Sequence, residues 1–293
     1  MKLILNKCDT DNYLQLLADE FDGACSIGID KNFPARFLMP LMDLVDECHF
    51  ELGSECVDRV RMVKDEKEQQ LMIEASKIND LVVDEVINIC AKGNLTEKEV
   101  SDQLAGIYQK HGCTGNSFEP IVAYGKNGAD NHHSGDDSTL KPGDSIVIDI
   151  GGLYKGYCSD MTRTVFYKEV SPKQKAVYEL VLKAQKAAEA MIKPGVRLCD
   201  IDKCARDIIA EGGYTVEFNH RLGHFIGRDV HEWGDVSQNY DIEVQEGMTF
   251  SIEPGVYLQG EFGVRIEDLV LVTKEGCKVL NSYPKDLRVI GND

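Results

Sequence analysis

The sequence contains no run of about 18 consecutive apolar residues, which a membrane-spanning helix would require. Its opening apolar stretch, residues 1–6, gives way at once to Lys7 and Asp9, so we expect no secretory signal peptide there. The chain also lacks a Cys-x-x-Cys pair, and the closest two of its ten cysteines are Cys199 and Cys204. Cysteines scattered in this way indicate reduced thiols rather than a disulfide framework. We therefore expect a cytoplasmic protein with no membrane partner.

Basic residues are scarce, with 32 lysines and arginines against 50 acidic residues and a net charge of −18. A nucleic-acid partner needs clustered lysine and arginine side chains, so the charge balance argues against one. The excess of acid is compatible with carboxylates that bind metal, although most of it is expected on the solvated surface. The hydrophobic content of 43% and the charged content of 28% are typical of a soluble globular protein.

The first 56 residues form a short segment of mixed character. A helix is predicted over Tyr13–Phe21, a strand over Cys25–Ile29 and a second helix over Phe37–Glu47. Because this segment is small for an independent domain, we interpret residues 1–56 as a truncated N-terminal subdomain. The remaining residues, 57–293, would form the catalytic domain.

Within this larger part the order helix, helix, strands occurs twice. Apolar residues recur at three- and four-residue steps from Lys64 to Gly93. A second helix begins at Thr96, where Glu99 completes a capping box. Strand-like runs follow over Phe118–Tyr124, Ser145–Ile150 and Tyr157–Tyr167.

The second occurrence starts at Ser171 and Pro172, which open another long helix as N-cap and first helical residue. A shorter helix over Asp200–Glu211 follows, and then strands over Thr249–Glu253 and Gly263–Thr273. The recurrence favours an internal duplication. It predicts an α+β fold in which a curved antiparallel sheet is backed by helices, with a site in the cleft between the halves.

Two aspartates lie where a hairpin would bring them together. Asp149 falls on the polar side of the run Ser145–Ile150, whose even-numbered positions are all apolar. After a turn at Gly151 and Gly152, the returning strand carries Asp160. Two carboxylates held close together by a hairpin repel each other unless a cation or a proton lies between them. The alternative is a pair of exposed acids on a strand.

Two glutamates repeat the arrangement in the second half. Glu253 ends one predicted strand, and Glu267 lies in a second predicted strand that contains the β-branched residues Val264, Ile266 and Val270. An acid in a central strand is costly to bury without a cationic partner, which could be an arginine or a metal ion. Four such acids, two in each half, are better explained by shared metal ions than by separate salt bridges.

Histidines could supply a nitrogen ligand to the same site. His224 lies in an apolar, glycine-flanked run, where an isolated histidine could also be structural. His231 follows seven residues later, and His132 and His133 form a third imidazole group. An oxygen-rich site with one imidazole suits Mn²⁺, Co²⁺ or Fe²⁺, and Zn²⁺ less distinctively.

On these residues the chain resembles the pita-bread metallopeptidases, the family of methionine aminopeptidase, aminopeptidase P and prolidase. The resemblance extends from about Val60 to Ile290 and rests on five motifs: Asp149-Ile150-Gly151-Gly152, Ser159-Asp160-Met161-Thr162-Arg163-Thr164, Gly223-His224 with Val230-His231-Glu232, Ile252-Glu253-Pro254-Gly255, and Gly263-Val264-Arg265-Ile266-Glu267-Asp268. The arginine before the last glutamate and the Asp-Val-His-Glu run point to the proline-directed branch. Three residues near the cleft depart from the commoner family types: Phe225, Arg228 and Trp233.

The resemblance implies a duplicated helix-helix-sheet fold and a centre for two divalent metal ions. Asp149 would bind one ion, His224 and Glu253 would bind the other, and Asp160 and Glu267 would bridge both. Manganese is the first choice, with cobalt, iron or zinc as alternatives. The first 56 residues resemble only the second half of the branch's N-terminal domain, which helps to form a dimer in relatives. A homodimer is therefore one expectation.

The resemblance also implies hydrolysis of the peptide bond before proline at the N-terminus of short peptides, as in an Xaa-Pro dipeptidase or aminopeptidase P. Glu253 would move a proton from the attacking water to the leaving nitrogen. His231 would stabilise the oxyanion, and His132 would hydrogen-bond to the substrate. Arg265 would orient Glu267 or the substrate terminus, or it would form a structural salt bridge.

Two other functions stay open. One is a metalloaminopeptidase of broader specificity, or a metallohydrolase that acts on another amide. The other is a non-catalytic pita-bread module that binds peptides, although such modules usually lack a metal ligand and this sequence lacks none of the five. Creatinase, another protein with this fold, works without metal and does not need the full set of acids.

Overall fold

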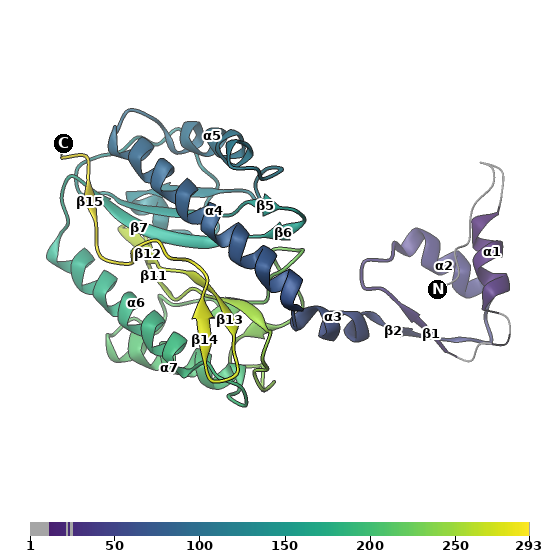
Figure 1. Cartoon of the computed structure of the whole chain (residues 1–293). Helices are drawn as coiled ribbons and strands as arrows, with labels where there is room; N and C mark the ends of the chain where they lie inside the picture. Colours follow the sequence, from purple (N-terminus) through teal and green to yellow (C-terminus); the bar gives the residue numbers. More distant parts are fainter. Residues whose placement is uncertain (1–11, 22, 24–25, 293) are drawn as a thin grey trace. The chain divides into compact units, whose positions relative to one another are not determined.

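The computed structural model describes residues 12–21, 23 and 26–292 (Figure 1). The chain divides into two compact units, with the division after Val60. The boundary between residues 56 and 57 stays a prediction. Among the described residues, no helix combines the length and the apolar character that crossing a membrane demands.

Among its described residues, the first unit contains two helices, a pair of parallel strands and most of a third helix. In chain order the first four of these elements are α1 (Tyr13–Glu20), β1 (Ser26–Ile29), α2 (Ala35–Leu44) and β2 (His49–Leu52). Cys25, the predicted first residue of the strand, lies outside the described residues. β2 and the following helix α3 (Ser54–Met62) were not predicted, because their mostly exposed side chains give no regular apolar pattern.

The second unit begins with the long helix α4 (Glu66–Ala91) and the shorter helix α5 (Glu97–Lys110). Both helices start at a capping box, formed by Asp65 with Glu68 and, as predicted, by Thr96 with Glu99. A four-stranded sheet follows, in the order β15-β7-β4-β3, made from β3 (Ile121–Tyr124), β4 (Ser145–Ile150), β7 (Met161–Tyr167) and β15 (Val289–Ile290). The short elements η1 (Gly125–Ala129), β5 (Leu153–Tyr154) and β6 (Tyr157–Cys158) connect these strands.

The same order then recurs. Ser171 caps the long helix α6 (Pro172–Met191), and the shorter helix α7 (Leu198–Glu211) follows. A three-stranded sheet is formed by β10 (Thr249–Ile252), β13 (Asp268–Val272) and β14 (Cys277–Val279). Two hairpins accompany this sheet: β8 (Gly223–His224) with β9 (Asp235–Val236), and β11 (Gly255–Leu258) with β12 (Phe262–Arg265).

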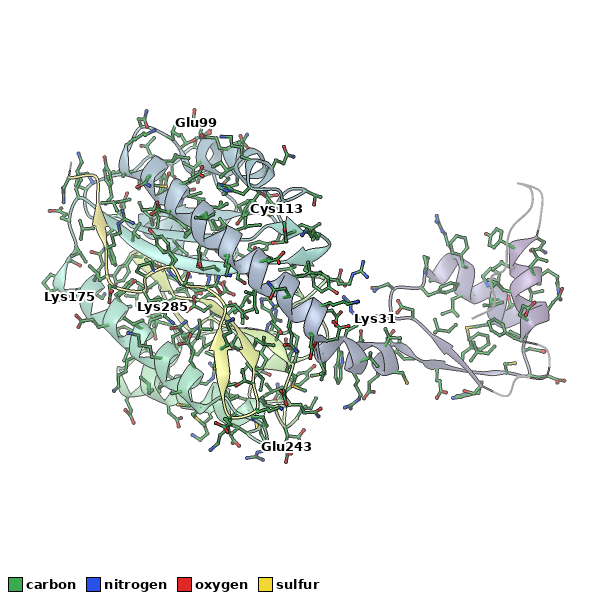
Figure 2. The ribbon with its side chains drawn as sticks, viewed as in Figure 1. Lys31, Glu99, Cys113, Lys175, Glu243 and Lys285 are labelled. Atoms are coloured by element: carbon green, nitrogen blue, oxygen red, sulfur yellow. The ribbon has the colours of Figure 1, made fainter. Side chains whose placement is uncertain are left out.

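Each half has its own apolar core. The first core lies between α4, α5 and β4 and contains Val86, Leu104 and Ile148, while the second includes Val181 of α6 and Phe250 of β10. Side chains fill the space between the helices and the strands of this unit (Figure 2). The halves meet where β12 lies against β4 and η1. The predicted α+β order, helix, helix and strands repeated, is therefore observed.

The strand predicted over Gly263–Thr273 is broken in the structure. Ile252 pairs with Asp268 and Gly255 pairs with Arg265, which leaves Glu253 and its following proline opposite Glu267 and its preceding isoleucine. Proline has no N–H to donate to the ladder, and the N–H of Glu267 instead donates to the carbonyl oxygen of Thr162 at 3.1 Å. Both glutamates therefore lie at an interruption of the ladder, where their side chains reach the junction of the two halves.

Candidate active site

The first half contributes Asp149 and Asp160 from adjacent strands. Asp149 pairs with Thr162 across β4 and β7, and Asp160 directly precedes β7, so the two aspartates are diagonal neighbours on one face. The Oδ1 atom of each is buried and has no hydrogen-bond partner within the described part of the chain. Buried polar atoms normally have a partner, so these two oxygens fit ligands to a cation.

The second half contributes an imidazole and two more carboxylates. His224 Nε2 lies 3.4 Å from Asp160 Oδ2 and 3.5 Å from Glu253 Oε1. Its Nδ1 faces the carbonyl oxygen of Phe225 at 3.2 Å, so Nε2 is directed at the carboxylates. One ligand atom each from Asp160, His224 and Glu267 lie within 4.8 Å of one another. The candidate ligands, which were predicted from separate stretches of the sequence, therefore lie close together in the structure.

Electrostatics in this cluster favour bound cations. Burial, together with the charge of neighbouring acids, raises the pKa values of Asp160 and Glu267 well above their usual range. Burial raises the pKa of Glu253 to about 7, which the charges of His224 and Arg265 oppose. Burial lowers the pKa of His224, which favours the neutral imidazole that ligates metal. Four carboxylates and one imidazole form a donor set that suits divalent metal ions.

Arg265 connects the acids of the two halves. Its buried guanidinium donates from Nη2 to Asp149 Oδ2 at 2.6 Å and from Nε to Thr162 Oγ1 at 3.0 Å. The hydroxyl of Thr162 in turn donates to Glu267 Oε2 at 2.7 Å. Arg265 thus forms an ion pair with Asp149 and reaches Glu267 only through Thr162.

The acids line a cavity of about 620 Å³ that also exposes two predicted substrate-binding histidines, His132 and His231. The ring of His231 stands edge-on to that of His224, with 4.3 Å between ring centroids and 82° between planes. Burial, and then the charges of His224, Arg221 and His132, lower the pKa of His231 to about 4. His231 is therefore neutral at pH 7 and retains one N–H as a donor.

Two cavity residues, His220 and Tyr257, were missed in the sequence. His220 Nε2 lies 3.0 Å from the Tyr257 hydroxyl, which also accepts from Arg265 Nη1 at 2.9 Å. Burial lowers the pKa of His220 to about 3 and raises that of Tyr257 to about 12. In the sequence, the one signal for these two residues was their closeness to candidate ligands. His220 lies four residues before His224, and Tyr257 lies four residues after Glu253.

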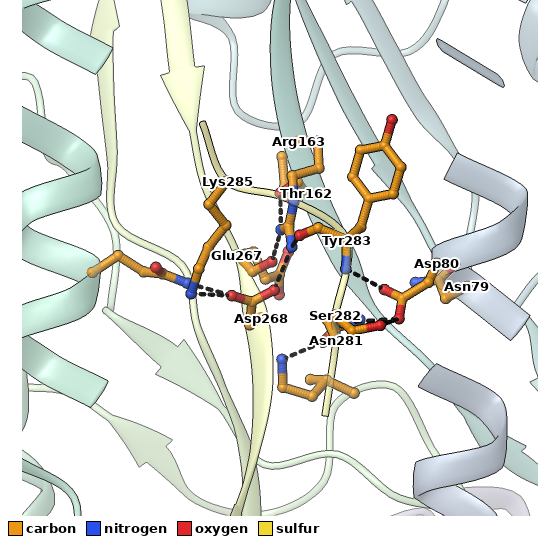
Figure 3. A network of polar contacts seen from close by, with 12 residues as sticks. Asn79, Asp80, Thr162, Arg163, Glu267, Asp268, Asn281, Ser282, Tyr283 and Lys285 are labelled. Atoms are coloured by element: carbon orange, nitrogen blue, oxygen red, sulfur yellow. Dashed lines mark hydrogen bonds and ion pairs between the residues drawn. The ribbon is translucent and has the colours of Figure 1, made fainter. Parts of the chain in front are cut away.

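A network behind the cavity fixes the chain around Glu267 (Figure 3). Arg163, with 2% of its side chain exposed, donates to the carbonyl oxygen of Glu267 at 2.6 Å and to Asp268 Oδ1 at 2.7 Å. Lys285 Nζ lies 2.6 Å from Asp268 Oδ2. Two cations thus neutralise a fully buried aspartate and hold the preceding residue, Glu267, in place.

His133 lies at the cavity wall but is engaged elsewhere. Its Nε2 lies 2.7 Å from Glu97 Oε2, and Glu97 Oε1 accepts from the backbone N–H of Tyr124 at 2.6 Å and from Asn127 at 3.0 Å. Glu97, His133 and Asp136 could geometrically hold an ion. The donors already bound to the buried carboxylate of Glu97 instead identify it as support for the loop that carries His132.

A duplicated helix-helix-sheet unit, with four carboxylates and a histidine converging in the cleft between its halves, defines a metallohydrolase of the pita-bread type. The model of metallopeptidase family M24 matches residues 70–274, and the chain belongs to this family. The predicted family, fold and enzyme class, a metal-dependent peptidase, are confirmed.

Similar proteins come from bacteria and archaea. The chain is 44% identical to the putative dipeptidase YkvY of Bacillus subtilis over 82% of its length, and it spans 66% of that relative. It is 38% identical to an Xaa-Pro dipeptidase of Pyrococcus horikoshii over 92% of its length and 78% of the relative. Among solved structures, a prolidase from Thermococcus sibiricus superposes with a TM-score of 0.92 at 33% identity, covering 98% of this chain and 80% of that one.

Proposed function

We propose that this protein is an Xaa-Pro peptidase of the prolidase or aminopeptidase P type, active on short peptides with two bound divalent metal ions. The observation that carries the proposal is the convergence of five ligand side chains in one cavity: Asp149, Asp160, His224, Glu253 and Glu267. The relatives named Xaa-Pro dipeptidase and prolidase support the same function.

The residues present fit the ions that this function needs. Asp149 would hold one ion, His224 and Glu253 the other, and Asp160 and Glu267 both. Divalent ions bound there lower the pKa of water and polarise a substrate carbonyl. We propose manganese first, with cobalt, iron or zinc as alternatives, because oxygen ligands dominate the site.

The cavity side chains have distinct proposed roles in the reaction. Glu253, which faces the cavity with 15% of its side chain exposed, would carry a proton from water to the leaving nitrogen. The neutral His231 would donate its N–H to the oxygen that becomes negative, and His132 would bind the substrate next to the cut. Arg265 would orient Asp149 through their hydrogen bond rather than react.

The proposed preference of the enzyme for proline is supported by apolar residues in the cavity wall. Phe118, Val230 and Tyr257 offer apolar surface beside the acids, which suits a pyrrolidine ring. A cavity of about 620 Å³ is also of a size for a short peptide rather than a folded protein.

Hydrolysis of Ala-Pro, Ala-Ala and Ala-Pro-Ala by the manganese-loaded protein tests the proposal. We expect Ala-Pro to be cleaved with a kcat/KM at least about 10-fold above that of Ala-Ala, since the pocket would discriminate by about 1–3 kcal/mol. Equal rates would favour the aminopeptidase of broader specificity. Binding of all three peptides without cleavage would favour the non-catalytic module.

We also propose a cytoplasmic location and a homodimer. Seven of the described cysteines are free thiols, which supports a reducing compartment: Cys56, Cys90, Cys113, Cys158, Cys199, Cys204 and Cys277. Light scattering of the purified chain would test the dimer, because a mass of 32.7 kDa or twice that value separates the two states.

A further inference from the structure

Glu232 follows His231 in the chain, yet its carboxylate binds two cations instead of lining the cavity. Arg61 Nη2 lies 2.6 Å from Glu232 Oε1, and Lys64 Nζ lies 2.9 Å from Oε2. The side chains of Glu232 and Lys64 are 4% and 2% exposed. A buried ion pair of this kind contributes little net stability, because the cost of desolvating both charges offsets much of their attraction. Its position beside a substrate-facing histidine therefore needs another explanation.

The carboxylate of Glu232 closes the loop on which His231 lies. The backbone N–H of Arg228 donates to Glu232 Oε1 at 3.0 Å, and the N–H of Glu232 donates to the carbonyl oxygen of Phe225 at 2.9 Å. Gly227 packs directly on the carboxylate, where an added Cβ would come within 2.7 Å of Oε1. The loop between β8 and β9 is therefore shaped around this one side chain.

The two cations belong to a segment that is itself held in place. Lys64 donates its backbone N–H to the carbonyl oxygen of Gly247 at 2.8 Å, and Val63 forms a bridge with Met248 just before β10. Arg61 is in the last turn of α3, and it also contacts the exposed Asp229 at 2.7 Å. Glu232 thus ties the His231 loop to residues about 170 positions earlier in the chain.

We propose that Glu232, held by Lys64 and Arg61, is a positioning residue that fixes where the His231 imidazole lies in the cavity. Only the role of His231 in catalysis rests on the proposed function. His231 touches the ring of the metal-ligand candidate His224, so a shift of its loop would move the donor relative to the substrate. A displacement of about 1 Å at such a donor can cost about 100-fold in rate.

The first test is a double-mutant cycle between Glu232 and His231 on hydrolysis of Ala-Pro. E232Q should lower kcat at least about 10-fold with unchanged KM and metal content, because Gln keeps the shape of the side chain but removes the charge that holds Lys64 and Arg61. In the H231N background, the same change should lower kcat less than about 2-fold, because the group being positioned is gone. D229N is the matched control, since it removes the exposed partner of Arg61 and should leave kcat as in the wild type.

The second test does not depend on activity. With the seven histidines labelled at Cε1, H231N identifies the His231 signal by its disappearance. E232Q should shift or broaden this signal, and D229N should leave it in place. If E232Q does not fold, K64M removes the same contact from the other side and should move the same signal.

The outcomes separate the proposals. Equal losses of kcat from E232Q in both backgrounds, or a His231 signal unmoved in both E232Q and K64M, would overturn the positioning role. A wild-type protein that cleaves no peptide would refute the proposed function alone, and the histidine signal would still decide whether Glu232 positions His231.

Discussion

Arg265 of β12 donates a hydrogen bond of 2.6 Å to Asp149 of β4, and this ion pair joins the two halves of the duplicated fold inside the active-site cavity. Only 3% of the Arg265 side chain and 14% of the Asp149 side chain are exposed. The pair holds the Asp149 carboxylate by Oδ2 and leaves Oδ1 without a hydrogen-bond partner among the described residues, so Oδ1 remains available as a ligand.

Substitution R265M should therefore destabilise the protein and weaken metal binding. Removal of one member of a buried pair leaves the other charge uncompensated, at a cost of about 3 kcal/mol in the free energy of unfolding. Urea unfolding with and without manganese measures the change. K203M, which breaks the exposed pair with Asp207, is the control and should leave the midpoint unchanged. An R265M protein as stable as K203M would show that the pair contributes nothing.

Substitution D160A should abolish peptidase activity. Asp160 is the carboxylate closest to His224 Nε2 and is proposed to bridge both ions, so its loss should lower both turnover and the number of bound metal ions. Metal analysis of the purified variant, together with Ala-Pro hydrolysis, measures both effects. D102A, an exposed acid on α5, is the control. Full turnover by D160A with its metal complement intact would contradict the assignment.

Chelation should inactivate the protein, and added Mn²⁺ or Co²⁺ should restore activity. The same treatment should lower the melting temperature, because the buried carboxylates then repel one another without cations between them. Differential scanning calorimetry before and after chelation and metal return measures the shift. Turnover that resists chelation would exclude a metal-activated water as the nucleophile.

Glu189 should make stability depend on pH. Burial, and then the charge of Asp268, raise its pKa from 4.5 to about 7, while Lys285 opposes the shift. The folded protein therefore binds more protons at this group than the unfolded chain between these values, so the free energy of unfolding falls as pH rises from about 4.5 to about 7. Above about pH 7 the free energy of unfolding is lowered by the full cost of burying the ionised Glu189.

Substitution E189Q removes that titration, so stability should fall less steeply with pH than in the wild type. Urea unfolding of the metal-loaded protein at pH 5 and pH 8 measures the slope. E179Q changes an acid on the same helix whose side chain is 62% exposed, and it should keep the wild-type slope. An E189Q slope equal to that of E179Q would refute the prediction.

Local signals in the sequence were sufficient for much of the fold. The capping box at Thr96 and the Ser171-Pro172 start were predicted because a helix end depends on residues only a few positions apart. The turn at Gly151 and Gly152 likewise indicated that Asp149 and Asp160 approach each other. The types and spacing of the acids and histidines predicted a metal centre, and the family was predicted from the resemblance of the motifs around them.

Contacts between distant residues decided the rest. The break at Glu267 could not be predicted from the strand-like run Gly263–Thr273 alone. It depends on Pro254 in the opposite strand and on the N–H of Glu267, which donates to Thr162 across the fold. The pairing of Arg265 with Asp149 joins residues 116 positions apart, and the anchoring of Glu232 by Lys64 joins residues 168 positions apart. A charged side chain accepts whichever buried partner the packed halves bring to it, so composition and spacing determine the kinds of groups in the site, and only tertiary structure determines which of them touch.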